Sequence, residues 1–202
     1  MSFTLWFTGL PSSGKSTIAK RVQERLAKKE IELHNLDGDN LRKKLHPDLG
    51  FSKEDRKINN QRIGVIASLL NHHNIGVIVA AVSSFREGRE IARDMVEEEG
   101  DFFQIFVDCP VEVCKERDPK GLYEKAENGE IPNFTGVNHP YERPGDPDVY
   151  VNTEEMSVEE CVDRVMKALD KKEIAETREP YTGLSESDEK KIKNRLEDLG
   201  YL

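Results

Sequence analysis

The stretch "LWFTGLPSSGKSTIAKRV", residues 5–22, places two glycines and a lysine directly after an apolar run. Its spacing matches G-x-x-x-x-G-K-S, with Gly9, Gly14, Lys15 and Ser16 at the fixed positions, which is the phosphate-binding loop or P-loop. A glycine-rich turn brings successive backbone N–H groups around one point, and the following helix adds the positive end of its dipole. The stretch therefore predicts a cradle for a polyphosphate.

The chain on either side of the motif has the order that a P-loop requires. Residues 3–8, "FTLWFT", are aromatic and β-branched, as in a buried strand, and Ile18, Val22 and Leu26 recur at helical intervals. Because strand, loop and helix follow one another, the motif predicts nucleotide binding rather than an ordinary turn.

The motif also predicts the cofactors, which are ATP and Mg²⁺. Lys15 is expected to reach the outer phosphates as a catalytic residue, and Ser16 to bind the magnesium ion. The expected nucleotide-binding residues are Gly9, Leu10, Pro11, Ser12, Ser13, Gly14, Lys15, Ser16 and Thr17.

Apolar runs alternate with helical patterns along the rest of the chain, which predicts an α/β fold. We expect further strands at residues 31–36, 75–82, 102–108 and 148–153. Helical patterns cover residues 53–73, 86–99, 111–117 and 157–172, the last opened by a capping box from Ser157 to Glu160. The expected architecture is a three-layer α/β/α P-loop kinase with a mostly parallel central sheet.

Residues 118–147 are dense in Gly, Pro and Asn and show little periodicity. A long loop of this kind inside a compact domain is uncommon unless it is functional, so we interpret it as a lid. The expected kinase domain is residues 1–172. Residues 173–202 form a predicted helical tail of unknown role, with a cap at Ser185 and a weak apolar stripe.

The composition excludes several classes of protein. The chain has 202 residues, 34% of them charged, and a net charge of −9, which argues against a binder of nucleic-acid polymers. No apolar stretch approaches the length of a membrane span and no secretory leader is evident, so we expect no membrane partner and a cytoplasmic enzyme. Cys109, Cys114 and Cys161 have no paired spacing and are expected to be reduced core thiols.

A second set of charged residues follows the second expected strand, in "LDGDNLRKKL". Asp37 and Asp39 stand where a parallel sheet opens its ligand crevice, and a phosphoryl-transfer enzyme needs a carboxylate there to hold magnesium or to deprotonate the acceptor hydroxyl. A helix amino-terminal cap is the alternative interpretation of the same residues. Basic residues are expected around the same mouth: Arg42, Arg56, Arg62, Arg86, Arg89, Arg117 and Lys120.

The third expected strand ends in Ser83 and Ser84 rather than in the acid that P-loop proteins commonly carry there. The metal must then depend on Ser16 and on the pair of Asp37 and Asp39. This departure argues against a GTPase switch and favours a kinase for a small molecule.

Six stretches in order, "GLPSSGKST", "LDGDNLR", "DLGFSKEDR", "VSSFR", "FVDCPVEVCKERDPKGLYEKAENGEIPNFTG" and "PYERP", closely resemble the adenylylsulfate kinase family. The resemblance covers about residues 2–169, and the lid segment is its most specific part. It implies that MgATP donates its γ-phosphate to the ribose 3′-hydroxyl of adenosine 5′-phosphosulfate (APS). It also implies a homodimer.

The resemblance implies roles for individual residues. Phe51 and Phe134 would sandwich the adenine of APS, a flat ring that favours aromatic stacking. Asp37 or Asp39 would serve as base or magnesium partner, and Arg117 would act as a lid arginine on the transferring phosphoryl group. The implied substrate-binding residues are Asp39, Arg42, Phe51, Arg56, Asn59, Val82, Ser83, Lys120, Asn133 and Phe134.

In the family that this chain resembles, the serine at the position of Ser83 is often described as a phosphoserine intermediate. In-line transfer between bound nucleotides needs positioning and charge stabilisation rather than a covalent relay, so we expect Ser83 to hydrogen-bond the substrate. The family usually has Pro where this chain has Ser84, and often Glu and Arg where it has Ile58 and Gln61.

Two other functions stay open from the residues. One is a P-loop kinase that acts on another nucleoside or on a sugar hydroxyl. The other is a non-catalytic nucleotide-binding regulator.

Overall fold

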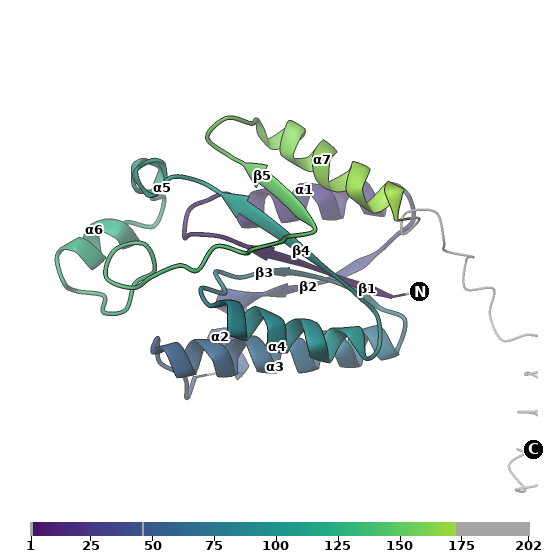
Figure 1. Ribbon diagram of the computed structural model, residues 1–202, viewed down its shortest axis with the longest axis horizontal. Helices are drawn as coiled ribbons and strands as arrows, with labels where there is room; N and C mark the ends of the chain where they lie inside the picture. The colour runs from purple at the N-terminus through teal and green to yellow at the C-terminus, as the bar shows by residue number, and fades with distance from the viewer. Residues whose placement is uncertain (1, 46, 173–202) are drawn as a thin grey trace, which may run out of the picture.

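A computed structural model describes residues 2–45 and 47–172, without the side chains of residues 39, 40, 43 and 45. A five-stranded sheet lies between two layers of helices (Figure 1). The expected tail helix, in residues 173–202, lies outside the described residues.

The sheet is parallel throughout, which confirms the expected α/β class. Its strands are β1 (Phe3–Thr8), β2 (Leu33–Asp37), β3 (Gly76–Ala80), β4 (Asp101–Asp108) and β5 (Val149–Asn152). They are ordered β2-β3-β1-β4-β5, so the strand that leads into the P-loop is central. The carboxyl ends of all five strands therefore meet at one edge of the sheet.

Helices cover both faces of the sheet (Figure 1). On one face lie α1 (Lys15–Ala27) and α7 (Val158–Lys171), and on the other lie α2 (Gly38–Leu45), α3 (Lys53–His72) and α4 (Arg86–Glu97). The short helices α5 (Val111–Arg117) and α6 (Leu122–Glu127) extend beyond the sheet at one end.

Each face has its own hydrophobic core. Ile18, Val22 and Leu26 of α1 are buried against the first face, as their helical spacing predicts. On the second face Trp6 of β1 packs with Ile63 and Ala67 of α3. The central strand is buried along its whole length, which fixes the position of the loop that follows it.

A third, smaller core joins the expected lid to the chain just before it. Cys109, Cys114, Tyr123, Ala126 and Phe134 are buried together, and Leu10 of the P-loop packs against them. Much of the apolar surface of this segment therefore contacts the P-loop and the start of α5. The described cysteines are free and buried, which agrees with their expected role in the core.

The helix starts differ in a way that bears on ligand binding. Ser52 with Asp55, and Ser157 with Glu160, form capping boxes that satisfy the first N–H groups of α3 and α7. In contrast, α1 begins after Gly14 with no side-chain cap and no acidic residue in its first turn. Its amino terminus is therefore suited to an anion.

The strand bounds differ from the expected ones by two residues at two places and by one residue elsewhere. Residues 31 and 32 are not part of β2, although Ile31 is buried, because the chain from α1 enters the core before it pairs with β3. Residues 81 and 82 likewise follow β3 as irregular chain. This early end frees backbone groups to form the wall of a cavity.

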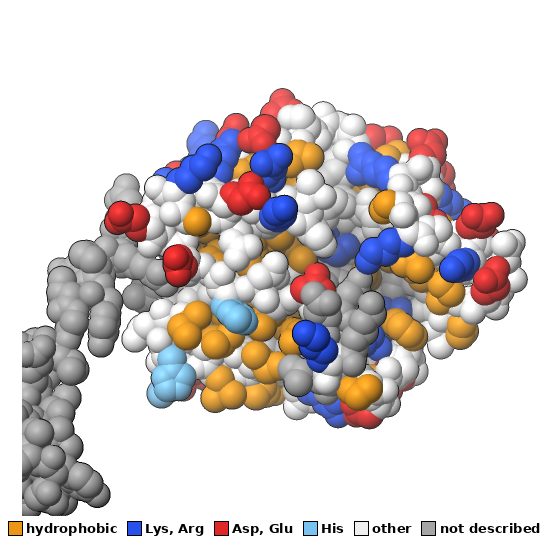
Figure 2. Space-filling model, turned by 180° about the vertical axis from the view of Figure 1, so that it is seen from behind, with side chains coloured by type: hydrophobic (Ala, Val, Ile, Leu, Met, Phe, Trp, Pro, Cys, Tyr) orange, Lys and Arg blue, Asp and Glu red, His pale blue; other side chains and the backbone are white. Residues whose placement is uncertain are grey.

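Surface charges of both signs are interspersed on the face shown in Figure 2, and apolar side chains gather in its lower half, next to histidine side chains. No broad basic patch is visible on that face. Among residues 2–45 and 47–172, no helix is both long and apolar enough to cross a bilayer.

Asp148, just before β5, joins three parts of the fold. Its carboxylate accepts hydrogen bonds from Gln104 N–H (2.8 Å), Arg93 (3.0 Å) and Lys172 (3.1 Å). Burial opposes ionisation, but these three donors outweigh it and hold the pKa of the Asp148 carboxyl below its ordinary value. The native state thus binds this proton less readily than the unfolded chain does.

We expect Asp148→Asn to lower the free energy of unfolding at pH 7 by about 1 kcal/mol, because solvent still reaches the residue. Since the folded pKa is depressed, the stabilisation is complete above the unfolded pKa of about 3.9 and is lost as pH falls through the folded pKa. Urea unfolding of both proteins from pH 7 to pH 3 should therefore show converging stabilities. Asp170→Asn, which breaks an exposed pair with Lys29, is the control; a constant difference across the pH range would contradict this account.

Candidate active site

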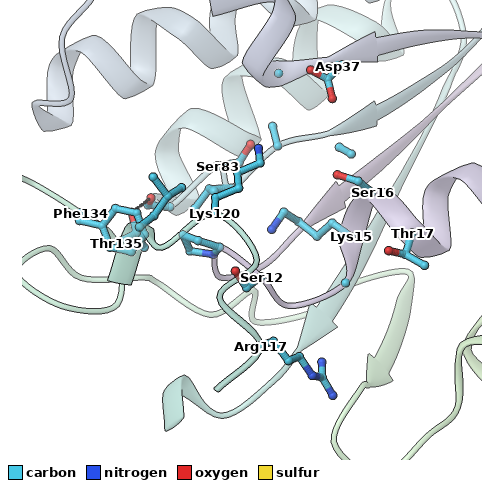
Figure 3. Close-up of a pocket in the computed structure, with 18 of the residues that line it drawn as sticks. Ser12, Lys15, Ser16, Thr17, Asp37, Ser83, Arg117, Lys120, Phe134 and Thr135 are labelled. Atoms are coloured by element: carbon cyan, nitrogen blue, oxygen red, sulfur yellow. Dashed lines mark hydrogen bonds between the residues drawn. The ribbon is translucent and has the colours of Figure 1, made fainter. Parts of the chain in front are cut away.

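One large cavity lies at the carboxyl edge of the sheet (Figure 3). Its volume is about 1240 Å³, and its walls come from the P-loop, the ends of β2 and β3, the start of α3 and the lid. Pockets for a single ligand usually span roughly 300–1,000 Å³, so this cavity has room for more than one small nucleotide.

The P-loop holds a conformation that depends on its glycines. Gly9 has a φ of +156°, and a Cβ there would lie 2.3 Å from the Val107 carbonyl oxygen. Gly14 has a φ of +96° and immediately precedes α1. Both glycines are therefore required by the backbone, as the motif predicts.

The neighbours of the P-loop fix its outer side. Tyr123 donates a hydrogen bond to the Pro11 carbonyl (3.0 Å), and Thr153 donates one to the Ser13 carbonyl (3.0 Å). The hydroxyl oxygen of Ser13 is buried and has no hydrogen-bond partner among the described residues. A loop held from both sides can present its N–H groups to a phosphate without reorganisation.

Lys15 lies inside this loop. It is 8% exposed, and its ammonium donates a hydrogen bond to the Leu10 carbonyl at 2.6 Å. Figure 3 shows its side chain extended over the loop, with Ser16 beside it. A cation held in this position is suited to contact the outer phosphates of a bound nucleotide.

Asp37 and Ser16 are the described side chains that fit a magnesium ion. Asp37 ends β2 and Ser16 lies in the first turn of α1, and their oxygens face the same space in Figure 3. Oxygen ligands from one or two side chains, completed by phosphates and water, are the usual environment of Mg²⁺. Asp39 lies in α2, but its side chain is outside the described part.

The opposite end of the cavity is aromatic and basic. Phe51, which is 48% exposed, has the guanidinium groups of Arg42 and Arg56 at 4.6 and 5.6 Å from its ring centroid. Phe134 is 9% exposed and packs edge-on against Tyr123, with ring centroids 5.0 Å apart. Both phenylalanines line the cavity, as expected for residues that bind a flat ring.

Arg56 links this end to the lid. It donates hydrogen bonds to the carbonyls of Phe51 (3.1 Å) and Asn133 (2.6 Å). Burial, together with the nearby charge of Arg42, lowers the pKa of Arg56 to about 10. Arg56 remains a cation at neutral pH, in a place where an anionic group would be stabilised.

The expected ring of basic residues is only partly confirmed. Arg42, Arg56, Arg117 and Lys120 line the cavity, together with the expected Asn59, Val82 and Asn133. The expectation is wrong for three others, which face different partners. Arg62 pairs with Asp48, Arg86 donates to the Arg143 carbonyl, and Arg89 is buried behind the cavity wall. Their helical positions turn them away from the crevice.

Arg117 and Lys120 take different directions. Arg117 donates to the hydroxyl (3.0 Å) and the carbonyl (2.6 Å) of Thr153, and in Figure 3 its guanidinium points away from Lys15. Lys120 extends between Phe134 and Lys15. In this conformation Lys120 is directed toward the middle of the cavity, and Arg117 supports the loop after β5.

Ser83 lies in the cavity wall with a φ of +46°. Its hydroxyl accepts a hydrogen bond from Trp6 Nε1 (3.1 Å) and donates one to Asn60 Oδ1 (3.2 Å). The side chain is therefore engaged on both sides by groups of β1 and α3. The expected hydrogen bond between Ser83 and the substrate stays a prediction.

Sequence reasoning missed several residues that the fold brings to the cavity. Asn60, Thr135 and Thr153 line it, and none was named above as a site residue, although Thr135 lies at the end of the lid stretch that resembles the family. Thr153 could have been found, since it follows the fifth strand at the same edge of the sheet as the P-loop. Asn60 carried no comparable signal, and for Thr135 the only signal was its place next to Phe134, because the contacts of both residues join distant segments.

Comparison with known proteins adds the family. The family model for adenylylsulphate kinase matches residues 1–152 of this chain. The chain belongs to this family. An adenylyl-sulfate kinase of Acaryochloris marina is 47% identical over 176 residues, which cover 87% of this chain and 85% of the relative. The resemblance found in the six stretches is thereby confirmed.

Solved structures agree with the adenylylsulphate kinase assignment. The APS kinase of Mycobacterium tuberculosis, in complex with AMPPNP and APS, aligns with a TM-score of 0.80 and 44% identity, covering 84% of this chain and 98% of that one. A hexameric APS kinase from Thiobacillus denitrificans aligns at 0.65 and 28% identity, covering 86% of this chain and 30% of that one. The three-layer P-loop kinase fold is thus shared with solved APS kinases.

Proposed function

We propose that the chain transfers the γ-phosphate of ATP to the ribose 3′-hydroxyl of APS. The products are ADP and 3′-phosphoadenosine 5′-phosphosulfate, so the reaction belongs to sulfate activation. The observation that carries the proposal is the continuity of the cavity, which joins a P-loop to a pocket with two phenylalanines and two arginines. Adenylyl-sulfate kinases related to this chain by 44–49% identity support the same reaction.

In this proposal the two ends of the cavity bind different substrates. The P-loop amides and Lys15 bind the triphosphate, while Phe51 and Phe134 hold the acceptor purine and Arg42 and Arg56 attract its phosphosulfate. Such an arrangement brings a ribose oxygen into line with the γ-phosphorus, and positioning of this kind supplies much of the rate in phosphoryl transfer.

Asp37 and Asp39 share the remaining roles in this proposal. One accepts the proton of the 3′-hydroxyl, and the other helps Ser16 to hold magnesium. A bound Mg²⁺ would neutralise charge on the transferring phosphate. Lys120, directed into the cavity, adds a positive charge from the lid. We propose that Ser83 shapes the acceptor wall without forming a phosphoenzyme, since its hydroxyl already bonds to Trp6 and Asn60.

A coupled assay of ADP release tests the function directly. The enzyme is given ATP with APS, with adenosine, with gluconate or with no acceptor. Release that requires APS is expected, whereas release that requires gluconate would favour the sugar-kinase alternative. Nucleotide binding without turnover on any acceptor would favour a regulator and overturn the proposal.

The proposed stacking of the acceptor purine between Phe51 and Phe134 leads to a specific prediction. Phe51→Ala should raise the KM for APS by about 10-fold, because loss of one stacking face costs about 1 kcal/mol or more. The KM for ATP should change by less than twofold, since Phe51 lies at the acceptor end. Phe51→Tyr keeps the ring and is the control; an unchanged KM for APS in Phe51→Ala would remove Phe51 from the acceptor pocket.

The assembly and the location of the enzyme stay predictions. We propose a homodimer, and the exposed Val65 and Leu69, one turn apart on α3, offer apolar surface to a second copy. Sedimentation equilibrium should give twice the chain mass, and a monomer or hexamer would contradict this. We also keep the expectations of magnesium dependence and of a cytoplasmic enzyme.

A further inference from the structure

Ser84, which the proposed mechanism does not use, lies at the base of the acceptor wall. It follows β3 by four residues and is 1% exposed. Its backbone carbonyl accepts a hydrogen bond from Glu142 N–H at 2.8 Å. A small polar side chain is thus held between the end of the sheet and the irregular segment that returns from the lid.

The hydroxyl of Ser84 meets the hydroxyl of Thr135 at 2.8 Å. Thr135 is also 1% exposed and directly follows Asn133 and Phe134 in the lid. Buried hydroxyl groups are costly unless they are paired, so separation of these two would cost free energy, because each would lose this hydrogen bond. The pair therefore resists movement of this part of the lid away from β3.

Arg56 contacts this pair of hydroxyl groups through Ser84. Its guanidinium lies 3.4 Å from the Ser84 hydroxyl and can only donate. Ser84 therefore accepts from Arg56, while either hydroxyl can donate in the bond between Ser84 and Thr135. Because Arg56 also donates to the Asn133 carbonyl at 2.6 Å, two connections hold the same lid segment.

We propose that Ser84 and Thr135 are positioning residues of the acceptor subsite. Their hydrogen bond fixes the segment that carries Asn133 and Phe134 to the end of β3, and so determines how tightly the acceptor nucleotide binds. They take no part in transfer itself. The inference rests on the proposed function, because it assigns the acceptor to this end of the cavity.

Thr135→Val tests the inference, since it replaces the hydroxyl with a methyl group of similar size. We expect the KM for APS to rise about 3- to 10-fold, with kcat and the KM for ATP changed by less than twofold. Thr135→Ser, which keeps the hydroxyl, should restore the KM for APS. Ser84→Ala should act in the same direction, and the double variant should be no worse than the more severe single variant.

Thr4→Val is the matched control. Thr4 is buried, and its hydroxyl donates to Asn71 Oδ1 at 2.9 Å, at the other end of the sheet. It should lower the melting temperature as much as Thr135→Val does while leaving every kinetic constant unchanged. If Thr135→Val is recovered unfolded, Ser84→Ala carries the same measurement with a smaller change.

The outcomes separate the inference from the proposed function. An unchanged KM for APS in Thr135→Val and Ser84→Ala, with melting temperatures lowered as in Thr4→Val, would reduce the pair to a structural role and overturn the inference. A fall in kcat alone would also overturn it. Absence of APS-dependent turnover in the unsubstituted enzyme would instead overturn the proposed function.

Discussion

Lys15→Met is expected to lower kcat for APS phosphorylation by about 10²- to 10³-fold. Methionine fills similar space but carries no charge, so the negative charge that shifts onto the phosphate oxygens during transfer loses a preorganised cation. Lys15 is nearly buried and held by the Leu10 carbonyl, so no solvent-exposed lysine can replace it. The measurement is ADP release under saturating ATP and APS.

Lys20→Met provides the comparison for Lys15. Lys20 lies on the same helix, α1, but its side chain is exposed and does not line the cavity. Its loss should leave kcat within twofold. If Lys15→Met kept more than a tenth of the activity, the lysine would not contact the transferring phosphate and the role given to the P-loop would need revision.

The largest expected effect on stability belongs to Arg89. This arginine is 1% exposed and donates to two backbone carbonyls, those of Ser83 (2.5 Å) and Glu142 (2.6 Å). Its guanidinium also lies 5.6 Å from the ring centroid of Tyr141, and burial lowers the pKa of the Arg89 side chain. Arg89 thus joins the segment after β3 to the irregular chain that returns from the lid.

Arg89→Met should lower the free energy of unfolding by about 2–5 kcal/mol, because two buried carbonyls lose their donors at a cost of roughly 1–3 kcal/mol each. For a chain of this size that loss corresponds to a fall of roughly 5–20 °C in melting temperature. Thermal and urea unfolding measure it. At temperatures below the unfolding transition, kcat at saturating ATP and APS should change little, because the substitution acts mainly on stability.

Arg86→Met is the matched control for Arg89. Arg86 is exposed and donates to the Arg143 carbonyl at 2.8 Å, within the same returning segment. Its loss should cost less than about 1 kcal/mol, because water can replace the donor. Equal losses in the two variants would show that burial does not determine the contribution of Arg89.

The candidate site was predicted unevenly from the sequence. The P-loop could be located because its chemistry depends on neighbours in the chain, and the structure shows Gly9 and Gly14 in backbone conformations that favour glycine. The basic residues were predicted less well. Arg62 and Arg89 were expected at the mouth of the crevice, but Arg62 pairs with Asp48 and Arg89 donates to two backbone carbonyls. The direction of a side chain on a helix depends on the packing of that helix, which no local pattern supplies.

The sequence by itself predicted the strands and most of the helices, though not α2 or α6, together with the phosphate loop and the resemblance that identified the family, because each rests on residues close together in the chain. Only the tertiary structure decided which side chains share the cavity and which serve as supports, as with Ser84 and Thr135, 51 residues apart. Such pairs form only when folding brings distant segments together. Burial then makes an unpaired hydroxyl costly, so the polar groups of one segment must hydrogen-bond to those of another.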